Sequence, residues 1–143
     1  MQQPAWRKWI RIFSIIILLL TALVYMLIAF GEPNGKAFRY DDKHTIYYSA
    51  DALDSRLIKA VGDSLTRIGL FTPESRMDVQ VLFDPQKGDT IHMGYIVQRD
   101  RLTAEAKQGF REVTRYLYPL FRCDVKIMLK DAKFRVIEEM KLD

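Results

Sequence analysis

Residues 12–30 form an uninterrupted apolar run, and this run constrains the fold of the chain more than any other feature. Its nineteen residues carry no charge. At the rise of an α-helix they cover about 28 Å, close to the roughly 30 Å hydrocarbon thickness of a bilayer. A helix satisfies its own backbone hydrogen bonds inside lipid. The run therefore predicts a single transmembrane helix that anchors the rest of the chain.

The run has two other interpretations. A cleaved signal peptide also has a basic start, here Arg7, Lys8 and Arg11, and residues 29–31 would serve as a small-x-small cleavage site ending at Gly31. The run is longer than the usual 7–15 residues of a signal peptide. A buried core helix is disfavoured because the run is apolar on every face and the remaining chain is short. The retained anchor is favoured, and cleavage stays open.

The distribution of basic residues predicts an orientation. Three of them lie in residues 1–11, next to the span, and Lys36, Arg39 and Lys43 follow it closely. The first three are nearer the membrane, and the short head is easier to retain in the cytoplasm than the long tail. We expect a cytoplasmic amino end in the bacterial inner membrane, with the domain in the periplasm.

Outside the span the charge is nearly balanced. All 18 acidic residues and 19 of the 22 basic residues follow the run, which leaves that part at about +1. It therefore has no basic patch that would favour nucleic acid. Cys123 is the only cysteine, so no internal disulfide can form. The expected organisation is a cytoplasmic head (1–11), a transmembrane helix (12–30), a linker (31–36) and one extracytoplasmic α+β domain (37–143).

The hydrophobic periodicity of residues 37–143 predicts alternating strands and helices. A helix capped by Ser49 should bury a stripe formed by Leu53, Leu57, Val61, Leu65 and Ile68. Gly69 matches a left-handed residue at its end, whereas Gly62 inside it should tolerate alanine unless a close contact fills the space. A second helix should begin near Thr103 and kink or stop at Pro119. The expected strands are 37–40, 44–48, 77–84, 90–98, 123–129 and 134–140.

This element order predicts a ferredoxin-like two-layer sandwich extended by a carboxyl-terminal hairpin strand. Right-handed crossovers would place the first and third main strands in the centre of the sheet. The alternation sends one apolar set toward the helices: Val79, Val81, Ile91, Met93, Val125 and Ile127.

No catalytic constellation is evident in the sequence. A catalytic Cys123–histidine pair is disfavoured because Cys123 continues the alternation of a strand. His44 and His92, expected on adjacent strands, could ligate a metal with Asp41 or Asp42, although no close-spaced ligand pair supports this. Two solvated histidines are favoured instead. The doublets 41–42 and 138–139 are expected to be solvated.

Cofactor-binding motifs are likewise not found. The turn after the first strand has no glycine that would cradle a phosphate. The third strand offers no aromatic residue opposite its buried face on which an RNA base could stack. The sequence therefore predicts no cofactor, no metal and no nucleic-acid partner.

The outward-pointing residues of the sheet give the only candidate site. Four large apolar residues on four strands could form one interaction face: Leu82, Ile96, Met128 and Ile137. A contiguous apolar patch on a small domain usually marks a contact surface, although scattered exposed apolar residues are common. We therefore expect a membrane-anchored protein-interaction module, a subunit or scaffold of an envelope assembly, or a homo-oligomer. A periplasmic immunity- or inhibitor-type protein and a membrane-proximal enzyme are the alternatives.

Overall fold

The computed structural model describes residues 4–29, 34–84, 86 and 89–142. The chain divides into two units, residues 1–33 and 34–143, and each is considered by itself. The predicted linker falls partly outside the described residues, as does the turn that follows residue 84.

The first unit consists of helix α1 (Ala5–Ala29). It is long and apolar enough to cross a membrane, a test that a signal sequence also passes, and its described side chains from Ala5 to Leu27 are all exposed. The hydroxyls of Ser14 and Thr21 donate to carbonyls one turn earlier, at 2.9 and 2.8 Å, so these polar groups are satisfied within the helix. Helix α1 begins at Ala5, before the charge-free run that starts at Ile12, and residues 5–11 form its first turns.

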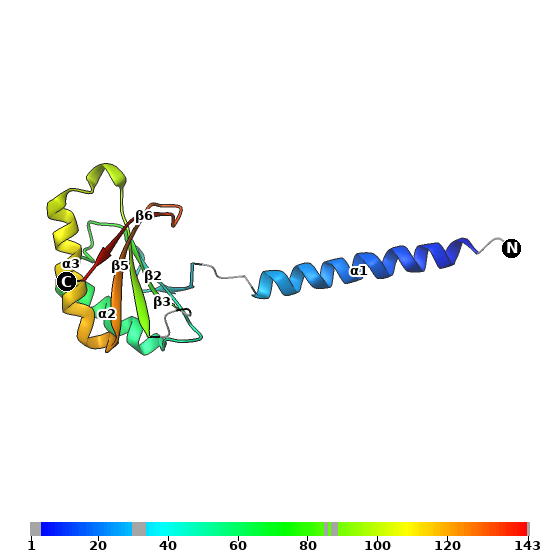
Figure 1. Ribbon diagram of the computed structural model, residues 1–143, viewed down its shortest axis with the longest axis horizontal. Helices are drawn as coiled ribbons and strands as arrows, with labels where there is room; N and C mark the ends of the chain where they lie inside the picture. Colours follow the sequence, from blue (N-terminus) through cyan, green and yellow to red (C-terminus); the bar gives the residue numbers. More distant parts are fainter. Residues whose placement is uncertain (1–3, 30–33, 85, 87–88, 143) are drawn as a thin grey trace. The chain divides into compact units, whose positions relative to one another are not determined.

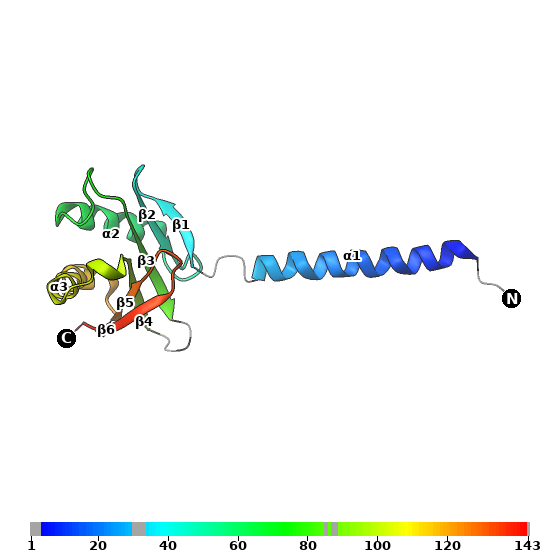
Figure 2. The same ribbon diagram turned by 90° about the horizontal axis from the view of Figure 1, so that it is seen from above.

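The second unit is an α+β domain with one six-stranded sheet and two helices, α2 (Ser55–Arg67) and α3 (Ala104–Phe121) (Figure 1). A short 3₁₀ helix, η1 (Arg99–Arg101), precedes α3. The strands are β1 (Lys36–Arg39), β2 (His44–Tyr48), β3 (Met77–Asp84), β4 (Thr90–Ile96), β5 (Asp124–Lys130) and β6 (Val136–Lys141). Both helices cover the same face of the sheet (Figure 2).

The strand order corrects the predicted topology. Neighbouring strands follow one another in sequence order, β1-β2-β3-β4-β5-β6, with β2–β3 and β4–β5 parallel and the other pairs antiparallel. A ferredoxin-like sheet would instead place β2 beside β4. The prediction was wrong because hydrophobic alternation fixes the face of each residue and does not identify the neighbouring strand.

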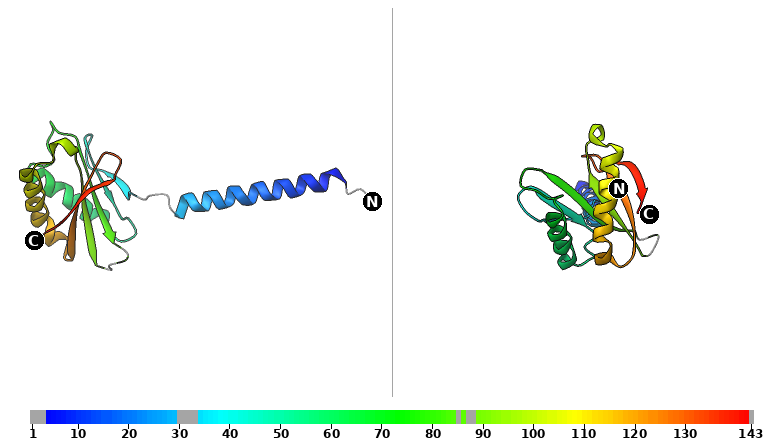
Figure 3. Two further views of the ribbon diagram at one scale, coloured as in Figure 1. Left: turned by 45° about the horizontal axis from the view of Figure 1, so that its top comes forward. Right: turned by 90° about the vertical axis from the view of Figure 1, so that its left-hand side faces the viewer.

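The same order gives the two crossovers opposite hands. The parallel pairs β2–β3 and β4–β5 point in opposite directions, and the chain moves across the sheet in one sense throughout. With α2 and α3 on one face, one strand–helix–strand unit must therefore be left-handed, the rare form. Figure 3 shows the two helices side by side over the sheet. The general preference for right-handed crossovers predicted a different sheet.

The start of α2 also differs from the prediction. The sequence assigned Ser49 to the start of α2, but the helix is capped by Asp54, whose carboxylate accepts from the backbone N–H of Arg56 at 2.9 Å. Ser49 instead extends the pairing of β2 with β3. Its N–H donates to the carbonyl of Val81, and its hydroxyl accepts from the N–H of Phe83 at 3.0 Å.

The core lies between the sheet and the helices. All six residues predicted to face the helices are buried, so this assignment is confirmed. Tyr95 is buried in the same layer and exchanges a 2.8 Å hydrogen bond with Thr114 of α3. Burial raises the pKa of the Tyr95 hydroxyl. The α3 helix starts after Thr103, close to the predicted start, but it continues through Pro119 to its end at Phe121.

Two glycines, Gly62 inside α2 and Gly69 just after its end, differ in their surroundings. Gly69 has φ +81°, which confirms the predicted left-handed helix end. A Cβ at Gly62 would overlap the ring of Tyr40. The close contact that could make alanine unfavourable at Gly62 is therefore present.

Candidate functional site

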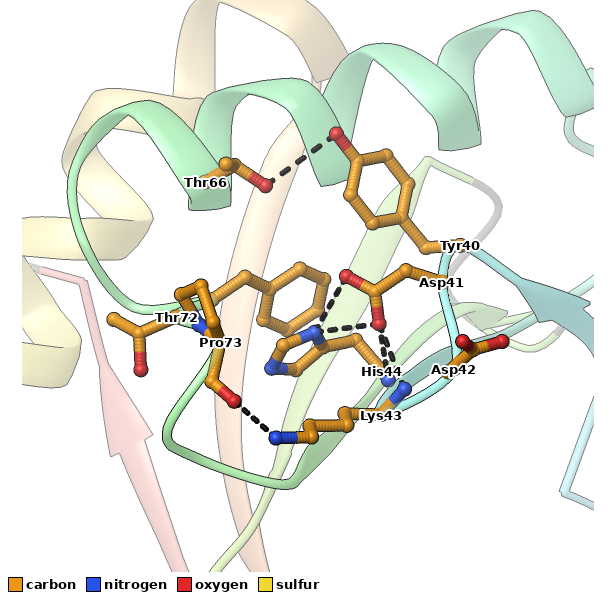
Figure 4. A pocket seen from close by; sticks show the side chains of 9 residues that line it. Tyr40, Asp41, Asp42, Lys43, His44, Thr66, Thr72 and Pro73 are labelled. Carbon is orange, nitrogen blue, oxygen red and sulfur yellow. Dashed lines mark hydrogen bonds and ion pairs between the residues drawn. The ribbon is translucent and has the colours of Figure 1, made fainter.

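The turn between β1 and β2 forms a polar cluster around Asp41. One oxygen of its carboxylate accepts the backbone N–H groups of Lys43 and His44, both at 2.8 Å. The Nδ1 atom of His44 lies 2.8 Å from both carboxylate oxygens (Figure 4). The hydrogen bond from His44 and the backbone N–H of Lys43 hold the pKa of Asp41 below its usual value. Asp41 thus fixes both the turn and the orientation of the imidazole.

His44 is buried and has one nitrogen without a partner. Its side chain is 2% exposed, and its ring stacks on Phe71 with 4.3 Å between centroids. An ionised Asp41 accepts hydrogen bonds only, so Nδ1 carries a proton and, in the neutral ring, Nε2 carries a lone pair. Nε2 is buried and has no hydrogen-bond partner among the described residues.

A cavity of about 300 Å³ adjoins this imidazole, and we call it the His44 pocket. Tyr40 forms one wall, with its hydroxyl donating to Asp63 at 2.7 Å and lying 3.3 Å from the Thr66 hydroxyl. On the opposite side, the ammonium of Lys43 donates to the carbonyl of Pro73 (Figure 4). The remaining lining residues are Asp41, Asp42, Phe71 and Thr72.

An imidazole oriented by a carboxylate is a competent general base when a substrate proton reaches its second nitrogen. The lining contains hydroxyls on Thr66 and Thr72, but each is already bonded, to the carbonyl of Gly62 and to Ser75. Cys123 precedes β5, does not line the pocket, and has its thiol pKa raised mainly by burial. His44 therefore offers one buried acceptor nitrogen beside the pocket, and the described lining contains no activated nucleophile.

The structure separates the two histidines that were considered as metal ligands. β3 lies between their strands, and His44 points toward the helices whereas His92 lies on the outer face. The Nε2 atom of His92 lies 3.2 Å from a carboxylate oxygen of Asp84. The described residues contain no group of three metal-ligating side chains. The expected adjacency was wrong because it depended on the ferredoxin-like strand order.

The four residues of the predicted interaction face do not form one row. Leu82 is opposite His92, whereas Ile96 is opposite Lys130, so these two lie toward opposite ends of the sheet. Met128 is opposite Gly94 between them and is 9% exposed. Leu82, Ile96 and Ile137 are half-buried. Binding through this face stays a prediction.

The chain itself covers part of this outer face. The side chain of Gln80, fully buried, donates to the carbonyl of Asn34 at 3.1 Å and accepts from the ammonium of Lys130 at 2.6 Å. Burial lowers the pKa of Lys130. Phe134, in the turn between β5 and β6, has φ +61° and packs edge-on against Tyr47 with 5.1 Å between centroids.

Sequence reasoning considers Asp41 and His44 together only as metal ligands and does not predict the hydrogen bond between them. The spacing of three residues across a tight turn was the available signal, since an aspartate there commonly accepts backbone N–H groups. It also missed the aromatic surface of α3, where Tyr116 is 46% exposed and Tyr118 and Leu120 are exposed too. Glu138 and Glu139, expected to be solvated, pair with Lys107 and Lys126.

No protein-family model matches this chain, and the searches of curated proteins and of solved structures gave no match either.

Proposed function

We propose that this chain is a single-pass membrane protein whose domain, residues 34–143, binds another protein at the membrane as a subunit or scaffold of an assembly. The observation that carries the proposal is helix α1, which is long and apolar enough to span a bilayer and has no buried side chain in its span. Such a helix is stable in lipid, where its backbone is internally bonded. Anchoring raises the effective concentration of the domain toward a membrane partner.

The exposed end of α3 is the surface best suited to the contact. Outside α1, the exposed large apolar side chains of the described chain are Tyr116, Tyr118, Leu120 and Val136. Tyr116 and Leu120 lie one helical turn apart and therefore on one face. Tyrosine is enriched at protein interfaces because it supplies a large apolar ring and a hydroxyl. The outer-face residues Leu82, Ile96, Met128 and Ile137 are the second surface.

Photo-crosslinking in native membranes tests the proposal. A photoreactive phenylalanine analogue at Tyr116 should form an adduct of defined mass with a partner or a second copy. The same analogue at Ile96 examines the outer face, and exposed Lys59 of α2 is the control position. An adduct at Tyr116 or Ile96 but not at Lys59 supports the proposal. Absence of adducts at both test positions, in membranes where the chain is intact, contradicts it.

We further propose that the amino end is cytoplasmic and the domain periplasmic in a bacterial inner membrane. A single cysteine at Lys59, introduced in a Cys123→Ser background, should react with an impermeant thiol reagent without permeabilising the inner membrane. Reaction only after permeabilisation would reverse the orientation. Mass spectrometry of the mature amino terminus separates a retained anchor from a cleaved signal peptide.

A proton-transfer enzyme is the second candidate, and the unpartnered Nε2 atom of His44 favours it. Hydrolysis of a model ester by the full chain should then fall strongly in His44→Gln. His92→Gln is the matched control, because His92 also neighbours a carboxylate but lies on the other face. Equal rates in the two variants would exclude His44 as the base.

A further inference from the structure

A second cavity, of about 470 Å³, lies where the end of α2 meets the beginnings of β3 and α3, and we call it the α2–α3 groove. Its walls are largely apolar and include Leu70, Met77, Val97, Leu102 and Phe110. The volume falls within the range of about 300–1,000 Å³ that is usual for small-molecule sites. The groove is separate from the predicted interaction face except at Ile96, which lines both.

Local backbone structure holds the walls of the groove apart. On one side, Gly69 adopts φ +81°, and the N–H groups of Leu70 and Phe71 both donate to the carbonyl of Leu65. On the other side, Phe110 is fixed by stacking on Tyr95, with 4.6 Å between ring centroids. The small side chain of Ala106 leaves the space between them open. The cavity is therefore preformed.

The charged residues of the groove are all of one sign. Arg76 and Arg101 line it, and no acidic residue does. Both arginines are exposed, and neither makes a side-chain hydrogen bond or ion pair within the described part of the chain. Glu74, Asp100 and Glu105 are close in the sequence but do not belong to the lining. An apolar wall with two unpaired guanidinium groups selects a ligand with both an apolar chain and a negative head.

We propose that the α2–α3 groove binds an anionic amphiphile, with its acyl chain along the apolar wall and its carboxylate or phosphate on Arg76 and Arg101. Guanidinium groups bind both head groups through paired N–H donors. The same arginines disfavour a cationic head, and a neutral head leaves them without a partner. The head group can come from a free fatty acid or from a phospholipid. The proposal does not depend on the protein-binding function.

The test uses the full chain in phosphatidylcholine bilayer discs with a decanoate probe that carries a photoreactive diazirine. After irradiation, peptide mapping should locate the label within residues 96–110 or at Met77. Decanoate should compete at concentrations about tenfold below those of decanol and decylamine, since one charge-assisted hydrogen bond corresponds to about tenfold in affinity. Equal competition by the three compounds, or label confined to α1, would show partition into the bilayer only and would overturn the proposal.

Matched variants locate the site. Arg76→Gln and Arg101→Gln should each weaken decanoate competition about tenfold, whereas Arg115→Gln, the same change at an exposed position of α3 outside the groove, should leave it unchanged. Ala106→Leu should fill the groove and abolish labelling while the circular dichroism spectrum and melting temperature are retained. Labelling that persists in folded Ala106→Leu would contradict the site. A short-chain phosphatidic acid used as competitor identifies the source of the head: stronger competition than decanoate assigns a phospholipid, and weaker competition assigns a fatty acid.

Discussion

On the face of the sheet that α2 and α3 cover, the central strands place Val79, Met93 and Ile127, whereas on the outer face the same strands place Gln80, Gly94 and Lys130. The covered face is apolar and closed by helices. On the outer face, the buried side-chain amide of Gln80 accepts a hydrogen bond from the Lys130 ammonium and donates one to the carbonyl of Asn34. The two faces of the sheet are therefore held by different contacts: apolar packing on one face and hydrogen bonds to a buried amide on the other.

This difference predicts how each face responds to substitution. Burial on the helix side contributes in proportion to the apolar area removed from water. On the outer face a buried polar group must keep its partners, because an unsatisfied donor or acceptor costs about 1–3 kcal/mol. The helix side should be sensitive to lost volume, and the outer side to lost partners.

Replacing one isoleucine on each face by alanine compares how much stability is lost when side-chain volume is removed. Ile127→Ala should lower the free energy of unfolding by about 2–5 kcal/mol, because Ile127 is fully buried and a cavity remains. Ile96→Ala, at a half-buried position, should cost about 1 kcal/mol. Urea unfolding of the full chain in a nonionic detergent, followed by circular dichroism, measures both. Similar losses for the two variants would mean that the outer face is as closed as the core.

Replacing each of two glycines by alanine compares how much stability is lost when a methyl group is added. Gly62→Ala should cost about 1–3 kcal/mol because the new methyl overlaps the Tyr40 ring. Gly94→Ala should cost less, since its Cβ would lie 3.0 Å from the nearest atom of Gln80, against 2.3 Å from the Tyr40 ring at Gly62. The same urea titration decides between them. If the overlap is the cause, the loss from Gly62→Ala should shrink in a Tyr40→Ala background.

The Gln80–Lys130 bond tests lost partners on the outer face. Gln80→Leu should lower the free energy of unfolding by about 1–3 kcal/mol by leaving the half-buried Lys130 ammonium without this acceptor. Adding Lys130→Met should recover part of the loss, because the two changes act on one contact. Strict additivity of the two losses, measured by urea unfolding, would contradict a coupled pair.

The smallest effect concerns pH at the His44 pocket. The pKa of Asp41 is lowered in the folded protein from its usual 3.8, so its contribution to stability is present above pH 3.8 and is lost as the pH falls through the folded value. Asp41→Asn should therefore reduce the melting temperature at pH 7, and the difference from the unchanged protein should close in acid. A difference independent of pH down to complete acid unfolding would show that ionisation of Asp41 is not involved.

Much of the domain could be predicted from local pattern. The strand spanning His44 to Tyr48, a helix start near Thr103 and the left-handed Gly69 follow from residue types and periodicity, and the structure contains all three. The faces of the strands were predictable for the same reason, since side chains alternate with a period of two. These features depend on residues within a few positions of one another.

The candidate sites were less predictable because they depend on distant residues. Ile58 of α2 is fully buried, whereas the predicted stripe contains its neighbour Leu57 instead. The His44 pocket requires Phe71 to pack on His44 from a loop beyond α2. The α2–α3 groove requires the end of one helix and the start of the other to meet at a strand edge. No short-range pattern contains that information.

By itself, the sequence determined an apolar helix long enough to span a membrane, the type of the main elements that follow it, and the inward side of each strand. Only the tertiary structure decided that the strands lie in sequence order, that one crossover is left-handed, and that His44 and His92 face opposite sides. The reason is physical: periodicity fixes the direction of each side chain within its own element. Neighbouring strands are chosen by long-range contacts, such as Ser49 with Val81 and Gln80 with Lys130, whose partners lie 32 and 50 residues apart.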